Sequence, residues 1–85
     1  MTATNSGDLT ITLAGNGKTA AGLKSDVAGA RFVNNDTLAI NATGSFENLT
    51  GIDWAGEVAN AGTITTNAGL NIGSVTGAGS LTVTG

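Results

Sequence analysis

Two stretches of the chain alternate between apolar and polar residues, as a half-buried β-strand does. In Asp8–Leu13 the apolar positions are Leu9, Ile11 and Leu13, and threonines occupy the opposite face. In Thr37–Ala42 the inward positions are Leu38 and Ile40. The first stretch ends at a Gly-Asn-Gly corner and the second is followed by Thr43-Gly44, residues that are typical of turns. We therefore predict two strands here.

The last third of the chain is partly repetitive. Asn60-Ala61-Gly62 recurs seven residues later as Asn67-Ala68-Gly69, and each copy precedes a short alternating stretch. Gly77-Ala78-Gly79 then leads into a further stretch, Ser80–Thr84. Short strands between small Gly/Asn corners are what tight hairpins or solenoid coils require, and periods below about twenty residues favour a β-solenoid over helical repeats.

The remaining stretches are less regular. Residues 1–7 have no periodicity, and we expect a flexible arm. Residues 18–30 combine Leu23 and Val27 at helical spacing with Gly22 and Gly29 inside the same stretch, so a short helix and a long loop are both open. For Ser45–Ile52 we expect irregular structure, with a bulge or a turn at Thr50-Gly51.

Together these patterns predict an all-β protein. We expect short antiparallel strands in a small sandwich or barrel, or a β-solenoid-like arrangement, with at most one short helix near 18–30. The expected organisation is an arm over residues 1–7 and a single β domain over residues 8–85.

Composition changes this picture in one respect: the core is thin. The 85 residues include 14 glycines, no proline and no cysteine, so neither stiff loops nor disulfides offset the entropy of folding. Charged residues are only 11% of the chain, which leaves few side chains to block sheet edges. We therefore expect a homo-oligomer or a chain that docks on a larger body, with a trimer favoured slightly over a dimer.

Charge and missing residue types exclude several functions. There is no histidine, cysteine or tyrosine, so the commonest bases, metal ligands and nucleophiles are lacking. We predict no enzyme activity, no catalytic or metal site and no cofactor. The net charge of −3 argues against nucleic acid and anionic membranes as partners. The first residues lack the features of a secretory signal, so we expect synthesis in the cytoplasm.

Three groups of residues were weighed as sites. Residues 15–19 (Gly-Asn-Gly-Lys-Thr) resemble the end of a phosphate-binding loop but are better explained as a turn. Asp53 and Glu57 are four residues apart and are better explained as solvated carboxylates than as an acid–base pair. Trp54, the only tryptophan, is either a core residue or an interface anchor. The predicted interface residues are Thr2, Ala3, Thr4, Phe46, Ile52 and Trp54.

Two resemblances suggest functions. Residues 60–85, with Gly77-Ala78-Gly79 before Ser80-Leu81-Thr82-Val83-Thr84-Gly85, look like coils of secreted β-solenoid adhesins of the autotransporter and haemagglutinin type. That resemblance implies a segment of an extracellular or cell-surface structural protein without catalytic residues. In overall character the chain also resembles small bacteriophage capsid decoration (cement) proteins. This second resemblance is our first hypothesis, and it implies a virion protein that binds the major capsid protein or another virion protein as a homo-oligomer.

Overall fold

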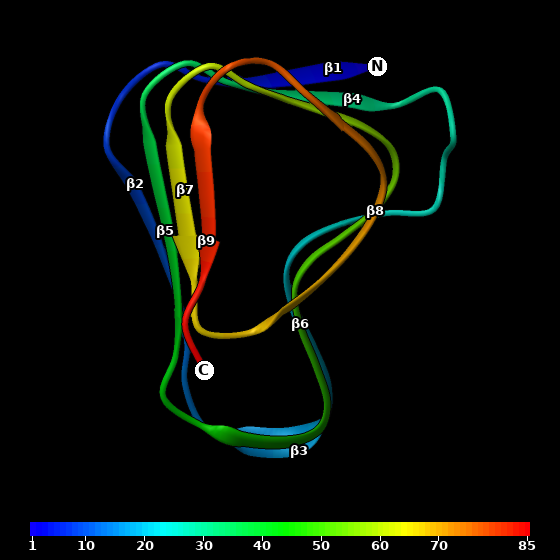
Figure 1. The fold of residues 1–85 in the computed structure, drawn as a ribbon. Helices are drawn as coiled ribbons and strands as arrows, with labels where there is room; N and C mark the ends of the chain where they lie inside the picture. The colour runs from blue at the N-terminus through cyan, green and yellow to red at the C-terminus, as the bar shows by residue number, and fades with distance from the viewer.

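The computed structural model describes residues 1–85 and contains nine strands and no helix (Figure 1). The strands are β1 (Thr2–Asn5), β2 (Leu9–Leu13), β3 (Asn16–Ser25), β4 (Arg31–Asn34), β5 (Thr37–Ala42), β6 (Ser45–Asn60), β7 (Thr63–Thr66), β8 (Gly69–Thr76) and β9 (Ser80–Val83). The predicted all-β class is therefore confirmed. The structure holds no helix that could cross a membrane.

Every strand pair is parallel, so the prediction of antiparallel strands is wrong. One sheet has the order β2-β5-β7-β9, and the other contains β1, β4, β6 and β3, with β8 also pairing to β6. Parallel neighbours need a long connection between them. Here the rest of one turn of the chain supplies it, because each strand pairs with its equivalent one turn later. The chain is a β-solenoid, and it is not a sandwich or barrel.

The solenoid has four successive turns. We call residues 2–25 coil 1, residues 31–54 coil 2, residues 57–72 coil 3 and residues 74–83 coil 4. The strand β6 bends from coil 2 into coil 3, and β8 bends from coil 3 into coil 4. One inward column shows the spacing: Leu9, Leu38, Ile64 and Leu81 stack on each other, 29, 26 and then 17 residues apart.

The solenoid narrows between coils 2 and 3. In Figure 1 the chain of coils 1 and 2 descends to the bottom of the view, where β3 lies, whereas the later turns close higher up. The strand pairing shows which residues of coil 2 have no partner in coil 3. Ile40 pairs with Thr66, and the next residue of coil 2 that pairs is Thr50, with Gly69. Coil 3 thus bypasses most of residues 41–49.

Asn67 closes the sheet at this narrowing. Its side-chain oxygen accepts the backbone N–H of Ala42 at 2.7 Å, and its Nδ2 donates to the Ala42 carbonyl at 2.9 Å. The side-chain amide therefore occupies the place of a backbone peptide group. The backbone of Ala42 keeps its hydrogen bonds on this side although no strand of coil 3 pairs with it.

The core lies inside coils 2 and 3. Its buried apolar residues are Ala30, Phe32, Leu38, Ile40, Ile52, Trp54, Val58 and Ile64. Trp54 packs on Phe32 with ring centroids 5.9 Å apart, and its Nε1–H donates to the Ala30 carbonyl at 3.0 Å. The predicted inward positions Leu38 and Ile40 are confirmed.

Two stretches differ from what the sequence predicts. Residues 18–30, for which a short helix and a long loop are both open from the sequence, form most of β3 and then a loop, because β3 pairs with β6. At Gly22 a Cβ atom would lie 2.7 Å from the Gly51 carbonyl oxygen, so glycine permits the two strands to approach. The expected flexible arm is also structured over Thr2–Asn5, which pairs with β4.

The stretch expected to be irregular, Ser45–Ile52, is part of the longest strand, β6. The bulge expected at Thr50-Gly51 is confirmed in the pairing with β8, where the register shifts between Thr50 and Ile52. A second shift, between Trp54 and Glu57, marks the corner where β6 enters coil 3.

Candidate interaction surfaces at the two ends of the solenoid

The first end of the solenoid is an uncovered core layer. Strands β1, β2 and β3 each pair with one neighbour only. Leu9 is 38% exposed, whereas its column partner Leu38 in coil 2 is 0% exposed. Ala3, Ile11 and Leu23 are likewise only partly buried, and their partners in coil 2 are buried. This end presents open backbone edges around an apolar interior.

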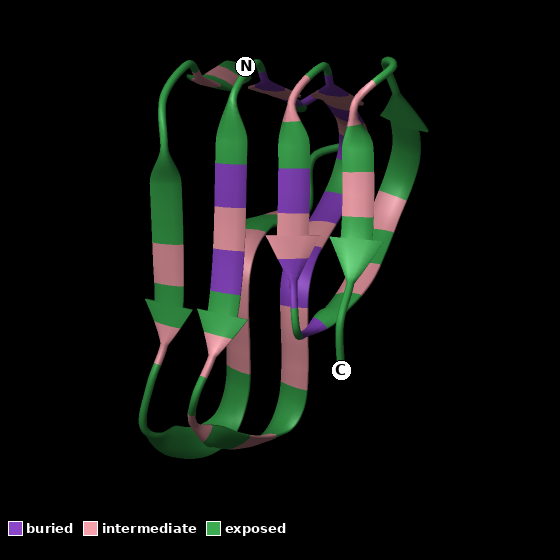
Figure 2. Cartoon of the chain, turned by 60° about the vertical axis from the view of Figure 1, so that its left-hand side comes forward, coloured by how far each residue is buried: buried purple, intermediate pink, exposed green.

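The last end of the solenoid is similar. Val75 and Val83 are 48% and 50% exposed, whereas their column partners Val58 and Thr66 are fully buried. Figure 2 shows the contrast along the second sheet: buried bands fall on β5 and β7, and β2 and β9 at its two edges carry none. Both end layers therefore carry apolar inward residues as the inner layers do, but no further coil covers them.

A ladder of asparagines runs along one inner corner. Asn5, Asn34 and Asn60 pair in register, and each Nδ2 donates to the next coil. The Asn5 Nδ2 lies 2.9 Å from the Asn34 Oδ1, and the Asn34 Nδ2 lies 2.9 Å from the Asn60 Oδ1. Asn34 and Asn60 are buried, and no buried side-chain polar atom lacks a partner. Such amide ladders fix which residue stacks on which.

The ladder has a direction. At the first end the Asn5 Oδ1 is in contact only with the Gly7 N–H, at 3.3 Å, so it retains capacity to accept a further donor. At the other end Asn60 donates to the Ser80 carbonyl, and the next position in the column is Gly77 with φ of 94°. A further asparagine could therefore extend the ladder at the first end.

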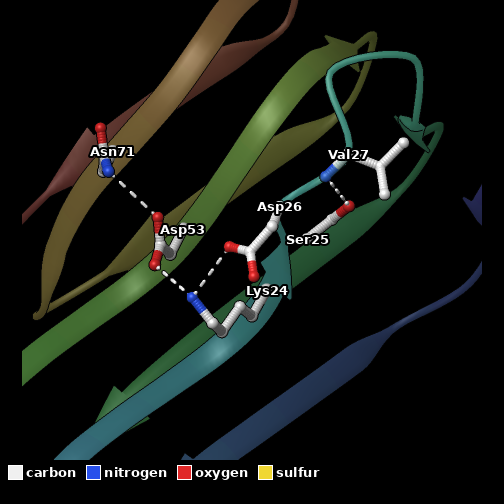
Figure 3. Close-up of polar contacts among 6 residues, drawn as sticks. All are labelled: Lys24, Ser25, Asp26, Val27, Asp53 and Asn71. Atoms are coloured by element: carbon white, nitrogen blue, oxygen red, sulfur yellow. Dashed lines mark hydrogen bonds and ion pairs between the residues drawn. The ribbon is translucent and has the colours of Figure 1, made fainter.

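A second ladder lies on the outer face of β3, β6 and β8 (Figure 3). The Lys24 Nζ lies 3.0 Å from the Asp53 Oδ2 and 3.2 Å from the Asp26 Oδ1, and Asn71 donates to Asp53 at 3.0 Å. The hydrogen bond from Lys24 is the main reason that the pKa of Asp53 is lowered, and the bond to Asp53 likewise raises the pKa of Lys24. These exposed pairs contribute little stability each, but they mark the same register as the inner ladder.

Glu57 forms the equivalent contact at the neighbouring corner. It accepts from the Thr76 hydroxyl and from the Arg31 Nε at 3.0 Å. These hydrogen bonds, that from Thr76 first, lower the pKa of the Glu57 carboxyl. Asp53 and Glu57, weighed above as a pair, thus hold separate cross-coil contacts.

The predicted interface residues fall into two groups. Ile52 and Trp54 are buried in the core of the chain itself. Thr2 and Thr4 are on β1 and Phe46 is on the part of β6 that coil 3 does not cover. Ala3 belongs to the uncovered layer of coil 1. Of the predicted set, the residues on β1 and Phe46 therefore lie where a partner could reach them.

Sequence reasoning missed the asparagine ladder and Asn67. A signal exists, because each ladder residue precedes an inward apolar residue by four positions: Asn5 and Leu9, Asn34 and Leu38, Asn60 and Ile64. Unequal coil lengths hide this repeat from any fixed period.

The other residues considered as candidate sites do not come together in the structure. Gly15 turns the chain with φ of 96°, and the other residues that resemble a phosphate loop, Asn16–Thr19, are the exposed first four residues of β3. No group of three or more acidic side chains comes together, and the chain encloses no pocket. Comparison of the chain with family models, with curated proteins and with solved structures found no match.

Proposed function

We propose that this chain is a non-enzymatic structural segment of a longer β-solenoid, of the kind that builds extracellular or cell-surface proteins. In this proposal the two ends are stacking surfaces for further coils. The observation that carries it is the contrast in burial along the columns of β2, β5, β7 and β9: the same kind of inward residue is buried in coils 2 and 3 and only partly buried or exposed in coils 1 and 4.

The physical reason lies in how solenoids gain stability. Each repeat buries its apolar face only against its neighbours, so terminal repeats need a polar cap to remain soluble. Leu9, Val75 and Val83 are apolar where a cap would be polar. The backbone edges are also open, and an open edge readily pairs with another strand. A stacked coil would satisfy both requirements at once.

The asparagine ladder supports the same function. An incoming coil with an asparagine in the ladder column could donate to the open Asn5 Oδ1, as Asn5 itself donates to Asn34. The ladder would then select the register of the incoming coil. A shift by one residue would turn every apolar side chain outward.

The hypothesis of a capsid decoration protein stays a prediction, with the major capsid protein or another virion protein as partner and a homo-oligomer, a trimer slightly favoured, as the assembled form. In that hypothesis the same open edges bind a virion protein and not a further coil. We place it second because the columns of this chain specify a cover of matching shape, which is another coil.

An added coil tests the proposal. A copy of residues 31–56 would be joined directly in front of Thr2, which reproduces the junction between Gly56 and Glu57 and places the copy over coil 1. We expect slower backbone hydrogen exchange in β2 and a rise in the free energy of unfolding of about 1–3 kcal/mol for each large apolar side chain that becomes fully buried.

The matched control is the same added coil carrying Leu38→Asp and Ile40→Asp in the copy, which cannot cover Leu9 and Ile11. Exchange in β2 should then stay at the level of the original chain. If the unmodified coil folds, as its own exchange reports, and leaves β2 unprotected, the first end does not accept coils and the proposal is wrong.

A further inference from the structure

Coil 4 has two sides where the other coils have three. The end of β8 and the strand β9 form those sides, but no strand lies beyond residues 69–72, which pair only with β6. Leu70 and Ile72 point inward there and are only partly buried. Their column partners one coil earlier, Ile52 and Trp54, are 0% and 4% exposed. The edge of residues 69–72 is therefore a core layer with a missing neighbour.

This edge also lacks the usual protection against pairing. No charged residue follows Glu57 in the sequence, so neither coil 4 nor the edge beside it carries a lysine or a carboxylate. Proteins commonly block exposed strand edges with such charges. The outward side chain between the two apolar ones, Asn71, donates to Asp53 on the neighbouring strand β6 (Figure 3).

We propose that the edge of residues 69–72 takes one extended, uncharged strand in parallel register, whose alternate apolar side chains stack on Leu70 and Ile72. That strand would complete the third side of coil 4. The inference rests on the proposed function and adds what this end accepts: a strand of a narrow coil, without charge and without the wide part found in coils 1 and 2.

A second copy of this chain does not fit the edge. Stacked head to tail, it would offer β3, a strand of ten residues that belongs to the 29-residue turn, to an edge of four residues. The ladder would also be broken, because Asn5 of the second copy would meet Gly77 instead of an asparagine. Such a contact leaves the wide part of coil 1 uncovered. The two ends of the chain therefore accept different coils.

Appending a strand at the C-terminus tests the inference. Thr66 pairs with Val83, so a copy of Gly69-Leu70-Asn71-Ile72 joined directly to Gly85 falls in register with the original four residues. We expect backbone hydrogen exchange in residues 69–72 to slow by about tenfold or more, because local opening must now break a ladder on both sides.

The matched control has the same composition with the order Leu-Gly-Ile-Asn, which moves both apolar side chains to the outer face. It should leave exchange at residues 69–72 unchanged. Equal protection by both extensions, or by neither, overturns the proposal. Light scattering on the unextended chain gives one more outcome that would overturn the proposal. If that chain is a dimer and hydrogen exchange in residues 69–72 is already slow, a second copy of the chain covers this edge. A failure here leaves the added-coil test at the first end unaffected.

Discussion

At the residue scale, asparagine side chains make polar contacts between coils for which other proteins use charged residues. Asn34 alone donates to the Asp36 carbonyl at 2.7 Å and to the Asn60 Oδ1 at 2.9 Å, and it accepts from Asn5. An amide can be donor and acceptor at once, so it can repeat along a column without unpaired charge. Asn67 uses the same chemistry to end a sheet, as described above.

The ladder predicts the effect of one isosteric change. Asn34→Asp keeps the shape of the side chain but removes its two N–H donors and buries a carboxylate. The change leaves the Asn60 Oδ1 without a donor, and the Asp36 carbonyl keeps only the backbone N–H of Thr63. We expect the free energy of unfolding to fall by about 1–3 kcal/mol or more at neutral pH, as for other unsatisfied buried polar groups. Chemical denaturation of the variant and of the original chain measures this difference in the free energy of unfolding.

Asn35→Asp is the control, because it adds the same charge at the neighbouring exposed position. It should change stability by less than about 0.5 kcal/mol. Equal loss in the two variants would show that charge, and not the ladder, is responsible.

At the scale of elements, the strands depend on how closely the corners stack. The corner of coil 3 rests on that of coil 2, and a Cβ at Gly62 would lie 2.0 Å from the Asp36 carbonyl oxygen. Gly79 has the same relation to Gly62 one coil further on. These positions need glycine because backbone approaches backbone, which a sequence pattern shows only as a turn.

Gly62→Ala should therefore destabilise the chain by about 1–3 kcal/mol, the range of overpacked sites. Gly7→Ala is the matched control: Gly7 occupies the same column in coil 1, where a Cβ would meet nothing within 4 Å. Thermal unfolding followed by circular dichroism compares the two variants. Equal melting temperatures would contradict the stacking of the corners.

The elements also show what the sequence could predict. The inward faces of β2 and β5 follow from alternation, and the corners at Asn60 and Asn67 follow from turn chemistry, because both are local. The parallel pairing was not predictable, since it joins residues 29, 26 and 17 positions apart and no constant period exists. For residues 18–30 the sequence leaves a helix and a loop open, and neither includes the strand β3, because the cross-coil pairing of β3 with β6 outweighs weak local propensity.

The candidate surfaces were predictable only in part. A thin core and few charges indicate that the chain needs a cover. The residues of β1 are predicted interface residues because residues 1–7 are expected to be an arm. Which apolar residues lack cover could not be read from the sequence, because Leu9 and Leu38 belong to similar alternating stretches and differ only in their place along the solenoid.

At the scale of the whole molecule, the chain is a stack of coils, and we expect that one coil can be added without disturbing the rest. Stability in such a stack is close to a sum over repeats and their interfaces. A sandwich or barrel lacks this property, because an insertion within a strand disrupts the sheet to which that strand belongs.

The most direct test duplicates coil 2 in place, with a second copy of residues 31–56 inserted between Gly56 and Glu57, inside strand β6. The inserted turn continues every column, since Arg31 pairs with Glu57. The control inserts the same residues between Gly44 and Ser45, where they are out of phase. We expect the in-phase protein to fold cooperatively with a larger free energy of unfolding than the original chain, and the out-of-phase protein to be much less stable. An unfolded in-phase protein, or equal stability of the two insertions, would contradict the stacked-coil architecture.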